Sequence, residues 1–424
     1  MTVRLTRRAA LAGSATMVLA PTVARAAPVE IEAHYAMPSV FKDVKDRIAA
    51  AFMATHPDVK VTWRQASASY DDATQLVLRE AITGRQPDIV FQGLNRLRVV
   101  AERGLAVDLK PLLAAEGDAA SFGYTPEILG LGQAAGIQVG LAFATSNPIV
   151  FVNADLFRRA GLDPERRLTT WDEVVDASRR ISTLGDGIHG AYYRWQGDWI
   201  YSALLFGFGG TMMDAAEREI GFAGREGRAS LTVLERLVRE GGMPALSGEA
   251  GAQAFAAGKV GMYFWSTAFL RQAMNALGQN FRLVTWEFPL GEPARGRLPT
   301  GGSAGMVLAR DPAKQQAAFR FLRFATGPEG CAIMVKGTGY VPVNAIAAQD
   351  PRWLGDFYRD NPLFMTGVRQ MPIMVPWYAF PGPNGVRISS VITDNVTRVV
   401  EQKASVDTAL ADMAREVTRL LPRV

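Results

Sequence analysis

The sequence predicts an α/β fold in which mixed β-sheets carry helices on their faces. Segments that alternate like strands are separated by segments with the 3.6-residue period of helices. The composition is that of a globular protein, with 48% hydrophobic and 21% charged residues. The length of 424 residues favours two or more domain-sized units, since single hydrophobic cores rarely grow beyond about 250–300 residues.

The first part of the chain alternates strands and helices. "VEIEAHYA" (29–36) has the pattern of a strand, and Ser39 is placed to cap the helix that follows. The apolar residues of that helix recur at helical spacing, at Phe41, Val44, Ile48 and Phe52. The next elements are a strand in 56–65, a helix over 70–82, a strand in 84–93 and a helix over 95–103.

Alternating strand and helix patterns return from residue 146 on, with a different sequence. "SNPIVFVNADLF" (146–157) runs from a strand into a helix. Thr170 and Glu173 form a capping box for the next helix, which has Val174, Ala177 and Ile181 on one face. Strands at 258–266 and 302–309 and a helix at 313–325 follow. The chain ends in an amphipathic helix with an apolar stripe of Val406, Leu410, Met413, Val417 and Leu420.

Residues 1–26 read as an export signal. They combine a basic start, a short apolar stretch and an Ala24-Arg25-Ala26 end. Arg7 and Arg8 fit the twin-arginine variant, and a Sec signal that contains two arginines is the alternative. The segment holds four arginines and no acid, so it accounts for most of the formal net charge of +5. The rest of the chain is nearly neutral and has no basic stripe of the kind that nucleic-acid binding needs.

The sequence offers little that would indicate an enzyme. Its single cysteine, Cys331, excludes an intramolecular disulfide. The three histidines, His34, His56 and His189, lack the spacing of zinc ligands. HExxH and P-loop motifs are missing from the sequence. We therefore expect no metal and no cofactor.

Several segments together resemble the periplasmic solute-binding proteins of ABC importers. They are "AAAFMATHPDVKVTW", "PDIVF", "FVNADLFRRAGLDP…TTWDEVVDASRRI", "AFAAGKVGMYFWS", "GGSAGMVLARD" and "ATGPEGCAIMVKGTGYVPVN". "WQGDWI", "FYRDNP" and the aromatic, proline-rich run ending in "GVRISS" are similar to the glycerol-3-phosphate-binding members of that family. The similarity extends from the first strand to the last helix.

The resemblance implies two α/β lobes, each a mixed sheet flanked by helices, with the ligand in a cleft that closes between them. The expected boundaries are 1–26 for the signal, 27–145 with 302–345 for the N-terminal lobe, and 146–301 with 346–424 for the C-terminal lobe.

The resemblance also implies the binding residues. The family's ligand pocket maps onto Tyr70, Ser146, Ser266, Gly302, Tyr340 and Arg387, with Trp195 and Trp199 matching two cleft tryptophans. Asp198 is an extra residue between those tryptophans. Considered one at a time, Ser146 and Ser266 would more often be capping residues. Gly302 would be a turn glycine, and Arg387 would be an exposed or ion-paired arginine. Trp265, Trp377 and Tyr378 are further candidates for stacking on the ligand, with packing as the alternative, and His34 ends the first strand.

This residue set suits a phosphate. Hydroxyl groups, a backbone N–H at glycine and one forked guanidinium are donors for its oxygens. The family's glutamate after the third strand, which holds the glycerol hydroxyls, is replaced in "IVFQGLNRL" by Gln92 or Gly93. The phosphate end of the pocket therefore matches the family, while the polyol end departs from it.

We accordingly expect a monomeric binding protein, not an enzyme, that carries a small organophosphate to the transmembrane subunits of an ABC permease. The ligand is expected to be sn-glycerol 3-phosphate or a glycerophosphodiester such as glycerophosphocholine. The alternatives are a sugar or oligosaccharide ligand, a periplasmic phosphodiesterase, and a structural or adhesion protein.

Overall fold

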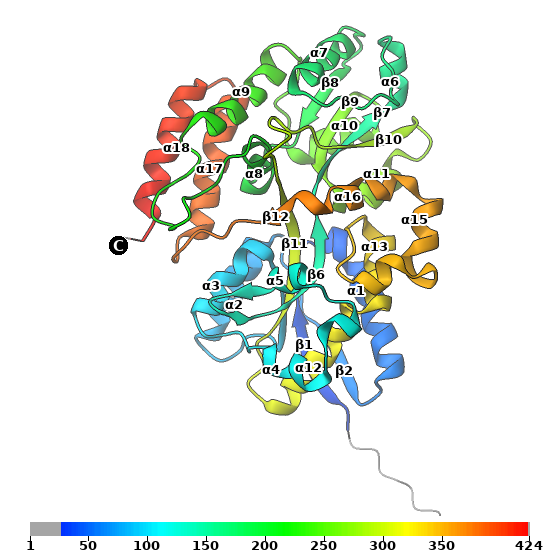
Figure 1. Cartoon of the computed structure of the whole chain (residues 1–424), viewed down its shortest axis with the longest axis vertical. Helices are drawn as coiled ribbons and strands as arrows, with labels where there is room; N and C mark the ends of the chain where they lie inside the picture. Colours follow the sequence, from blue (N-terminus) through cyan, green and yellow to red (C-terminus); the bar gives the residue numbers. More distant parts are fainter. Residues whose placement is uncertain (1–26, 423–424) are drawn as a thin grey trace, which may run out of the picture.

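A computed structural model describes residues 27–422 of the chain, so the predicted export signal lies outside the described residues. Two β-sheets, each covered by helices, form two lobes that lie one above the other in Figure 1. The strands β6 (Leu141–Ser146) and β11 (Leu298–Val307) lie in the middle of that view, where the lobes meet. The predicted α/β class, with mixed sheets flanked by helices, is confirmed.

The first lobe is built on a six-stranded mixed sheet. Its order is β12-β11-β3-β1-β2, with β6 paired to β11. Strand β1 pairs in parallel with β2 and β3, whereas β11 pairs antiparallel with β3 and β6. The remaining strands of this sheet are β1 (Val29–His34), β2 (Val59–Trp63), β3 (Ile89–Gly93) and β12 (Met374–Pro376).

The second lobe is built on a four-stranded sheet in the order β10-β7-β9-β8. Strand β7 is antiparallel to β9 and β10, and β8 is parallel to β9. The bounds are β7 (Pro148–Asn153), β8 (His189–Tyr193), β9 (Val260–Ser266) and β10 (Leu283–Glu287). Because β6 ends at Ser146 and β7 begins at Pro148, only Asn147 separates the two sheets along this crossing.

Helices cover both sheets. The helices of the first lobe are α1 (Pro38–Thr55), α2 (Tyr70–Ala81), α3 (Leu97–Glu102), α4 (Lys110–Glu116), α5 (Pro126–Gly130), α12 (Pro312–Ala325) and α13 (Pro328–Thr338), with the 3₁₀ turn η1 (Leu94–Arg96). Those of the second lobe are α6 (Ala154–Arg159), α7 (Trp171–Ser182), α8 (Asp198–Gly207), α9 (Arg225–Arg239), α10 (Gly248–Ala256), α11 (Leu270–Leu277), α17 (Gly385–Val400) and α18 (Val406–Leu420). Short helices α14 (Ala345–Gln349), α15 (Asp356–Asp360) and α16 (Met365–Arg369) connect the lobes.

Local sequence signals predict these helices well where they are strong. The capping box of Thr170 and Glu173 is present at the start of α7. The apolar stripe of α18 is buried as expected, apart from the half-buried Leu420. The cap at Ser39 was wrong, because α1 begins one residue earlier, at Pro38. The fixed φ of proline suits the first helical position, and Met37 caps the helix in a left-handed conformation instead.

Helix α1 also buries a lysine that its apolar pattern did not reveal. Lys45 is 1% exposed and lies on the buried face of α1. Its Nζ atom is 2.9 Å from the ring centroid of Phe91 and 4.0 Å from that of Phe143, and it has no hydrogen-bond partner. Burial lowers the pKa of Lys45 well below its ordinary value.

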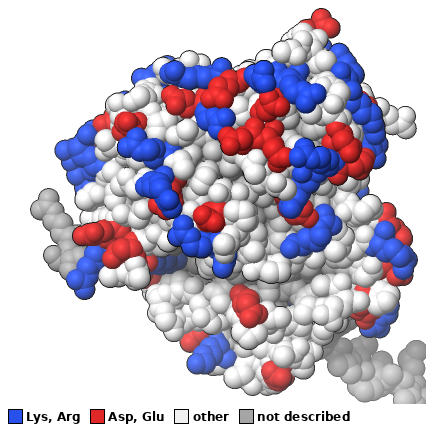
Figure 2. All heavy atoms as spheres, turned by 45° about the horizontal axis from the view of Figure 1, so that its top comes forward, with Lys and Arg blue, Asp and Glu red and all other residues white. Residues whose placement is uncertain are grey.

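Acidic and basic side chains are interspersed on the face shown in Figure 2, without a large patch of one sign. Within residues 27–422, no helix has both the length and the apolar character to cross a bilayer. The same residues contain no group of three His, Cys, Asp or Glu side chains that could hold a metal ion. Cys331 is buried, and burial raises the pKa of its thiol to about 12.

Candidate functional site

The carboxyl ends of strands from both sheets meet where the lobes join. At the end of β3, Gly93 pairs with Ser303 of β11. Two residues earlier in β11, Gly301 pairs with Ser146 at the end of β6. Across the crossing, Pro148 pairs with Ser266 at the end of β9. In open α/β sheets, ligands bind outside the carboxyl ends of strands, so this junction is the candidate site.

Two tyrosines and a serine form the part of the site that belongs to the first lobe. The hydroxyl groups of Tyr70 and Ser303 are buried and have no hydrogen-bond partner. Burial raises the pKa of Tyr70 to about 12, and the nearby hydroxyl groups of Ser303 and Tyr340 partly offset this effect. The ring of Tyr340 is held by stacking on Phe41, with a centroid distance of 5.4 Å. The structure therefore brings Tyr70 and Tyr340 together, although 270 positions separate them in the sequence.

The next part of the site surrounds Gly301 and Gly302. A Cβ atom on Gly301 would lie 2.7 Å from Ser146 Oγ and 2.9 Å from Trp199 Nε1, so glycine lets both side chains approach the strand. The indole Nε1 atoms of Trp199 and Trp195 are buried without a partner. Gly302 has a φ of +115°, a conformation that favours glycine.

Ser266 lies at the end of β9, beside this group by strand register. Its Oγ accepts a hydrogen bond of 3.2 Å from the backbone N–H of Ala268, so it caps the 3₁₀ turn η3 (Thr267–Phe269). Because the Ser266 oxygen only accepts a hydrogen bond in this cap, its O–H group can still donate one to a ligand. The neighbouring Trp265 packs edge-to-face on Trp199, with ring centroids 5.8 Å apart.

The end of β3 shows what stands in place of the family's carboxylate. Gln92 is fully buried, and its Oε1 accepts a hydrogen bond of 3.1 Å from Thr74, while its Nε2 has no partner. A Cβ atom on Gly93 would meet the Tyr70 ring at 2.9 Å and Asn95 Oδ1 at 3.0 Å. Asn95 is 4% exposed, and neither of its amide atoms has a partner. Sequence reasoning missed Asn95, although it follows the "FQG" segment by two positions.

Arg387 makes no hydrogen bond to these residues. It is exposed on α17 and forms no ion pair with the described residues. Ser389 lies two positions further on the same helix and is buried against the first lobe. Residues two apart on a helix do not share a face, so the side chain of Arg387 is not part of the contact that Ser389 makes. That the loop before α17 brings Arg387 to the ligand stays a prediction.

A buried arginine from the first lobe makes this contact. Arg96 is 4% exposed and donates from Nε to Asp71 at 2.6 Å and from Nη2 to Ser389 Oγ at 2.9 Å. Ser389 Oγ in turn donates to Asp198 Oδ2 at 2.8 Å. Burial raises the pKa of Asp198, and the charge of Arg96 counteracts this. The network Asp71–Arg96–Ser389–Asp198 therefore joins α2 and η1 of the first lobe to α17 and α8 of the second.

We expect Ser389→Ala to lower the free energy of unfolding by about 1–3 kcal/mol, because it leaves two buried charged groups without their shared hydroxyl. Ser390→Ala is the matched control, since the Ser390 hydroxyl bonds only to Val386 O of its own helix, at 3.2 Å. Urea denaturation of both variants measures the difference. Equal stability of the two variants would show that the network contributes nothing.

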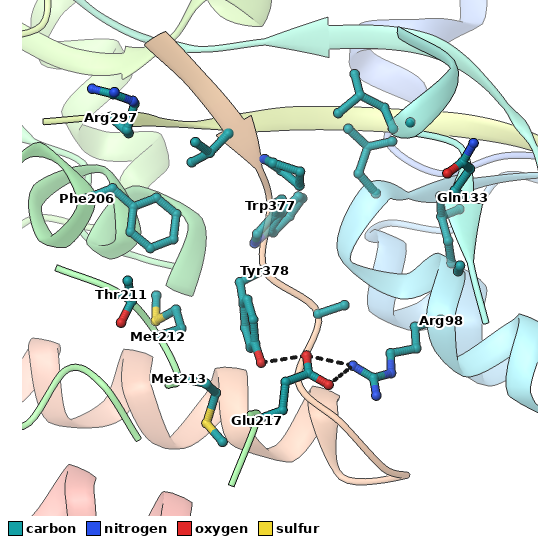
Figure 3. Close-up of a pocket in the computed structure, with 18 of the residues that line it drawn as sticks. Arg98, Gln133, Phe206, Thr211, Met212, Met213, Glu217, Arg297, Trp377 and Tyr378 are labelled. Carbon is teal, nitrogen blue, oxygen red and sulfur yellow. Dashed lines mark hydrogen bonds and ion pairs between the residues drawn. The ribbon is translucent and has the colours of Figure 1, made fainter. Parts of the chain in front are cut away.

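A pocket of about 750 Å³ is lined by residues of both lobes (Figure 3). Its walls are mainly apolar and include Phe206, Met212 and Trp377. At one end, Glu217 accepts hydrogen bonds of 2.8 and 2.9 Å from Arg98 and one of 2.9 Å from Tyr378. Trp377 and Tyr378, which the sequence analysis named as stacking candidates, line this pocket, whereas the residues of the predicted ligand set do not.

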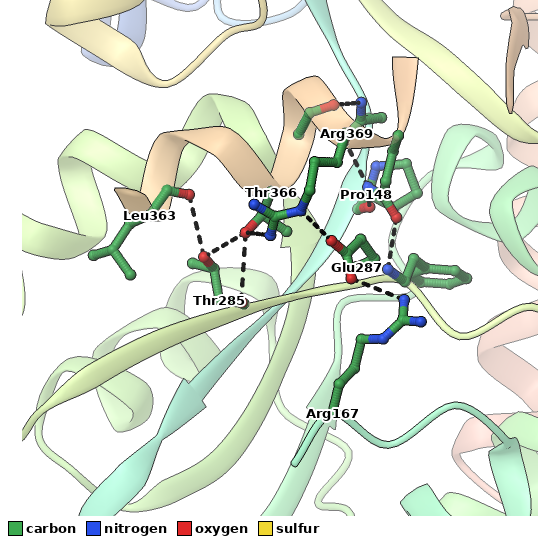
Figure 4. A network of polar contacts seen from close by, with 11 residues as sticks. Pro148, Arg167, Thr285, Glu287, Leu363, Thr366 and Arg369 are labelled. Carbon is green, nitrogen blue, oxygen red and sulfur yellow. Dashed lines mark hydrogen bonds and ion pairs between the residues drawn. The ribbon is translucent and has the colours of Figure 1, made fainter. Parts of the chain in front are cut away.

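A second polar network fixes the junction itself; Figure 4 shows the region from close by and labels Pro148, Thr285 and Arg369. Asn147 is fully buried; its Nδ2 donates to Gly367 O at 2.8 Å, and its Oδ1 accepts from Gln370 Nε2 at 2.9 Å. Gln370 also binds Pro148 O at 2.8 Å and the N–H of Phe288 at 2.7 Å. Segments before β7, after β10 and after α16 are thus held at fixed positions beside the candidate site.

The comparison with known proteins identifies the family. The model of the bacterial extracellular solute-binding proteins matches residues 47–366. The chain belongs to this family. It is an ABC-type solute-binding protein, and the resemblance seen in the sequence is confirmed.

Two curated relatives of this solute-binding protein are periplasmic proteins named for sn-glycerol 3-phosphate. The UgpB protein of Escherichia coli (strain K12) is 23% identical over 359 residues, which are 82% of this chain and 80% of the relative. UgpB of Agrobacterium fabrum is 25% identical over 363 residues, 81% of each chain.

Solved structures support the two-lobed fold of this solute-binding protein. UgpB from Mycobacterium tuberculosis in complex with glycerophosphocholine has a TM-score of 0.82 at 20% identity and covers 93% of this chain and 98% of its own. The cyclic α-maltosyl-1,6-maltose binding protein from Arthrobacter globiformis has a TM-score of 0.77 at 23% identity, covering 93% and 99%. Maltose-bound MalE3 of T. maritima has a TM-score of 0.79 at 19% identity, covering 93% and 100%. The predicted two-lobed binding-protein fold is confirmed.

Proposed function

We propose that this solute-binding protein captures a small organophosphate, sn-glycerol 3-phosphate or a glycerophosphodiester such as glycerophosphocholine, and delivers it to an ABC permease. The observation that carries the proposal is the group of buried hydrogen-bonding atoms without partners at the junction: Tyr70 Oη, Ser303 Oγ, Asn95 Oδ1 and Nδ2, and the Nε1 atoms of Trp195 and Trp199. Leaving such atoms unsatisfied costs about 1–3 kcal/mol each, and a polar ligand offsets that cost.

The proposed ligand contacts combine this group with other residues of the junction. They are Tyr70, Asn95, Ser146, Trp195, Trp199, Ser266, Gly302, Ser303 and Tyr340, with Gln92 supporting Thr74 behind them. Hydroxyl and indole groups donate to phosphate or polyol oxygens. Asn95 both donates and accepts, so it takes a polyol hydroxyl where a carboxylate would only accept.

The wider assignment follows from the family and from its named relatives. We propose export to the periplasm through the twin-arginine signal in residues 1–26, action as a monomer, and no catalytic turnover. We propose lobes of 27–145 with 302–345 and 146–301 with 346–424, except that β12 and the first residues of β11 belong to the sheet of the first lobe. Closure of one lobe on the other, coupled to ligand binding, is the expected signal to the permease.

A sugar or oligosaccharide is the second candidate ligand. The observation that favours it is the row of tryptophans at the junction, Trp195, Trp199 and Trp265, since indole rings offer apolar faces for stacking. Two of the structural neighbours are also named for maltose-type sugars.

Calorimetry with the mature protein distinguishes the two ligand classes. The probes are sn-glycerol 3-phosphate, glycerophosphocholine, inorganic phosphate and maltose. We expect heat of binding with one or both of the glycerol phosphates and none with maltose. Binding of maltose alone would refute the organophosphate proposal, and release of free choline from glycerophosphocholine would reveal an enzyme.

We expect Tyr70→Phe to weaken ligand binding about tenfold, because one hydrogen bond is worth roughly 1–1.5 kcal/mol. It should not lower stability, since the hydroxyl has no partner within the protein. Tyr358→Phe is the matched control: its hydroxyl is also buried without a partner, but it lies on α15. Calorimetry and thermal unfolding of both variants test this, and equal affinities would remove Tyr70 from the site.

A further inference from the structure

The proposed ligand carries a phosphate, and the residues described so far offer its negative charge no cation that is both unpaired and held in place. Arg387 is exposed on α17, and no hydrogen bond or ion pair with the described residues holds its guanidinium. Arg96 is buried, but its charge is balanced by Asp71 and lies close to that of Asp198. Arg98 is bound to Glu102 and Glu217. The better candidate is therefore an unpaired cation that the fold itself positions.

Arg194 lies at the edge of the second sheet, at the carboxyl end of β8. It directly follows β8, an edge strand that runs parallel to β9 with Tyr193 opposite Phe264. The backbone N–H of Arg194 continues this pairing with a bond of 3.4 Å to Phe264 O. Since Trp265 and Ser266 complete β9, Arg194 stands beside them at the carboxyl ends of the two parallel strands, where ligands bind in open sheets.

The guanidinium of Arg194 is held by neutral groups. Its Cζ lies 4.3 Å from the ring centroid of Trp265. Its Nε is buried without a hydrogen-bond partner. Burial raises the pKa of the neighbouring Tyr263 hydroxyl, and the charge of Arg194 partly offsets that rise. A Cβ atom on Gly248 would lie 2.7 Å from the Arg194 Nε, so the guanidinium also sits against the first residue of α10.

Its charge is not balanced by an acid. No Asp or Glu oxygen of residues 27–422 lies within 4 Å of the Arg194 nitrogens, whereas most arginines of the chain have such a partner. The amino end of α10 adds a partial positive charge at the same place. Trp195, the next residue, is 3% exposed and has its Nε1 buried without a partner. A partly buried cation, a helix amino end and an unsatisfied donor thus converge at one edge of the junction.

We propose that Arg194 binds the anionic group of the ligand, with the Trp265 ring as the platform that orients the guanidinium. The inference rests on the proposed function, because it names the charge partner of the same ligand. Stacking on the indole fixes the plane of the guanidinium and leaves its edge to donate two parallel hydrogen bonds to phosphate oxygens. Trp265 and Trp199 are in contact, which connects this anion position to the side chains around Gly301.

The test is calorimetry of Arg194→Gln, Arg194→Lys and Arg387→Gln with sn-glycerol 3-phosphate and glycerophosphocholine. We expect Arg194→Gln to weaken binding by about 100-fold, since two charge-assisted hydrogen bonds are lost. Arg194→Lys should recover part of the affinity, because it restores the charge without the fork. Arg387→Gln should weaken binding much less than Arg194→Gln, because no hydrogen bond or ion pair with the described part of the chain holds the Arg387 guanidinium in place.

The pH dependence separates charge recognition from a structural effect. The second ionisation of a phosphate monoester lies near pH 6, so binding of sn-glycerol 3-phosphate should strengthen between about pH 5 and 7. Arg194→Gln should flatten this dependence, which a merely structural role for Arg194 would leave intact. Thermal unfolding serves as the folding control.

The experiment distinguishes a failure of the Arg194 assignment from a failure of the proposed function. If the unaltered protein binds the glycerol phosphates and Arg194→Gln binds them equally well, the assignment of Arg194 is wrong and the proposed function stands. The same holds if Arg387→Gln abolishes binding instead. If the unaltered protein binds neither phosphate, both the proposed function and this inference are overturned.

Discussion

Replacing Lys45 with methionine is expected to raise the free energy of unfolding by at least about 2 kcal/mol at pH 7. Lys45 is 1% exposed, and its Nζ has no hydrogen-bond partner. The aromatic rings around it favour an ammonium by about 2 kcal/mol in total, but burial of an unpaired charge costs several kcal/mol. Desolvation therefore prevails, and the folded state disfavours the charged form of the amine. Methionine fills the same space without that cost.

The lowered pKa of Lys45 also determines how the free energy of unfolding changes with pH. The folded-state pKa of Lys45 is lowered below the ordinary value, so between these two pKa values the unfolded chain binds one proton more than the folded chain. Stability then rises with pH by about 1.4 kcal/mol per unit in that window, and it falls as the pH is lowered. The Lys45→Met protein should lack this contribution.

Urea denaturation at pH 7 and pH 9.5, followed by tryptophan fluorescence, measures both effects. Trp63 lies 5.2 Å from the Lys45 Nζ and reports on the same core. Lys42→Met is the matched control, because Lys42 lies on the same helix, its side chain is 70% exposed, and it pairs with Asp46. A Lys45→Met protein that is less stable than its parent would show that the amine has a favourable role in this core.

Replacing Gly302 with alanine is expected to destabilise the protein by about 3 kcal/mol or more and to abolish ligand binding. The φ of +115° is a conformation that side chains with a Cβ rarely adopt. The added Cβ would also overlap the carbonyl oxygen of Ala144 in the neighbouring strand. Either β6 or β11 must move, and both carry residues of the candidate site.

Gly104→Ala is a control for the two causes of this cost, the unfavourable backbone conformation and the overlap of the added Cβ atom. Gly104 also has a positive φ, of +65°, but a Cβ atom there would meet nothing within 4 Å. It should cost only about 1 kcal/mol, from backbone conformation alone. Thermal unfolding and calorimetry of both variants make the comparison. If Gly302→Ala is no less stable than Gly104→Ala, the close approach of β6 to β11 is not a constraint.

The candidate site was only partly predictable. Tyr70, Ser146, Tyr340, Gly302 and Trp199 were inferred from a resemblance, and they lie near β11 or near one another in the structure. Asn95 was missed because nothing in its local sequence distinguishes it from a turn residue; it stands out only through its burial without partners. For Arg387 the sequence leaves the orientation open, because proline and glycine before a helix predict where the helix starts and do not predict which face it turns inward.

The sequence by itself determined the elements and the fold class. Helix periodicity, strand alternation and caps such as Thr170 and Glu173 act between residues a few positions apart, so they can be read from the chain. The tertiary structure alone decided which charges are paired and which are free. Arg96 and Ser389 are 293 residues apart, yet their contact commits Arg96 to the lobe interface. The charge state of a cleft depends on such distant partners, because burial and pairing are set by the packing of the whole fold.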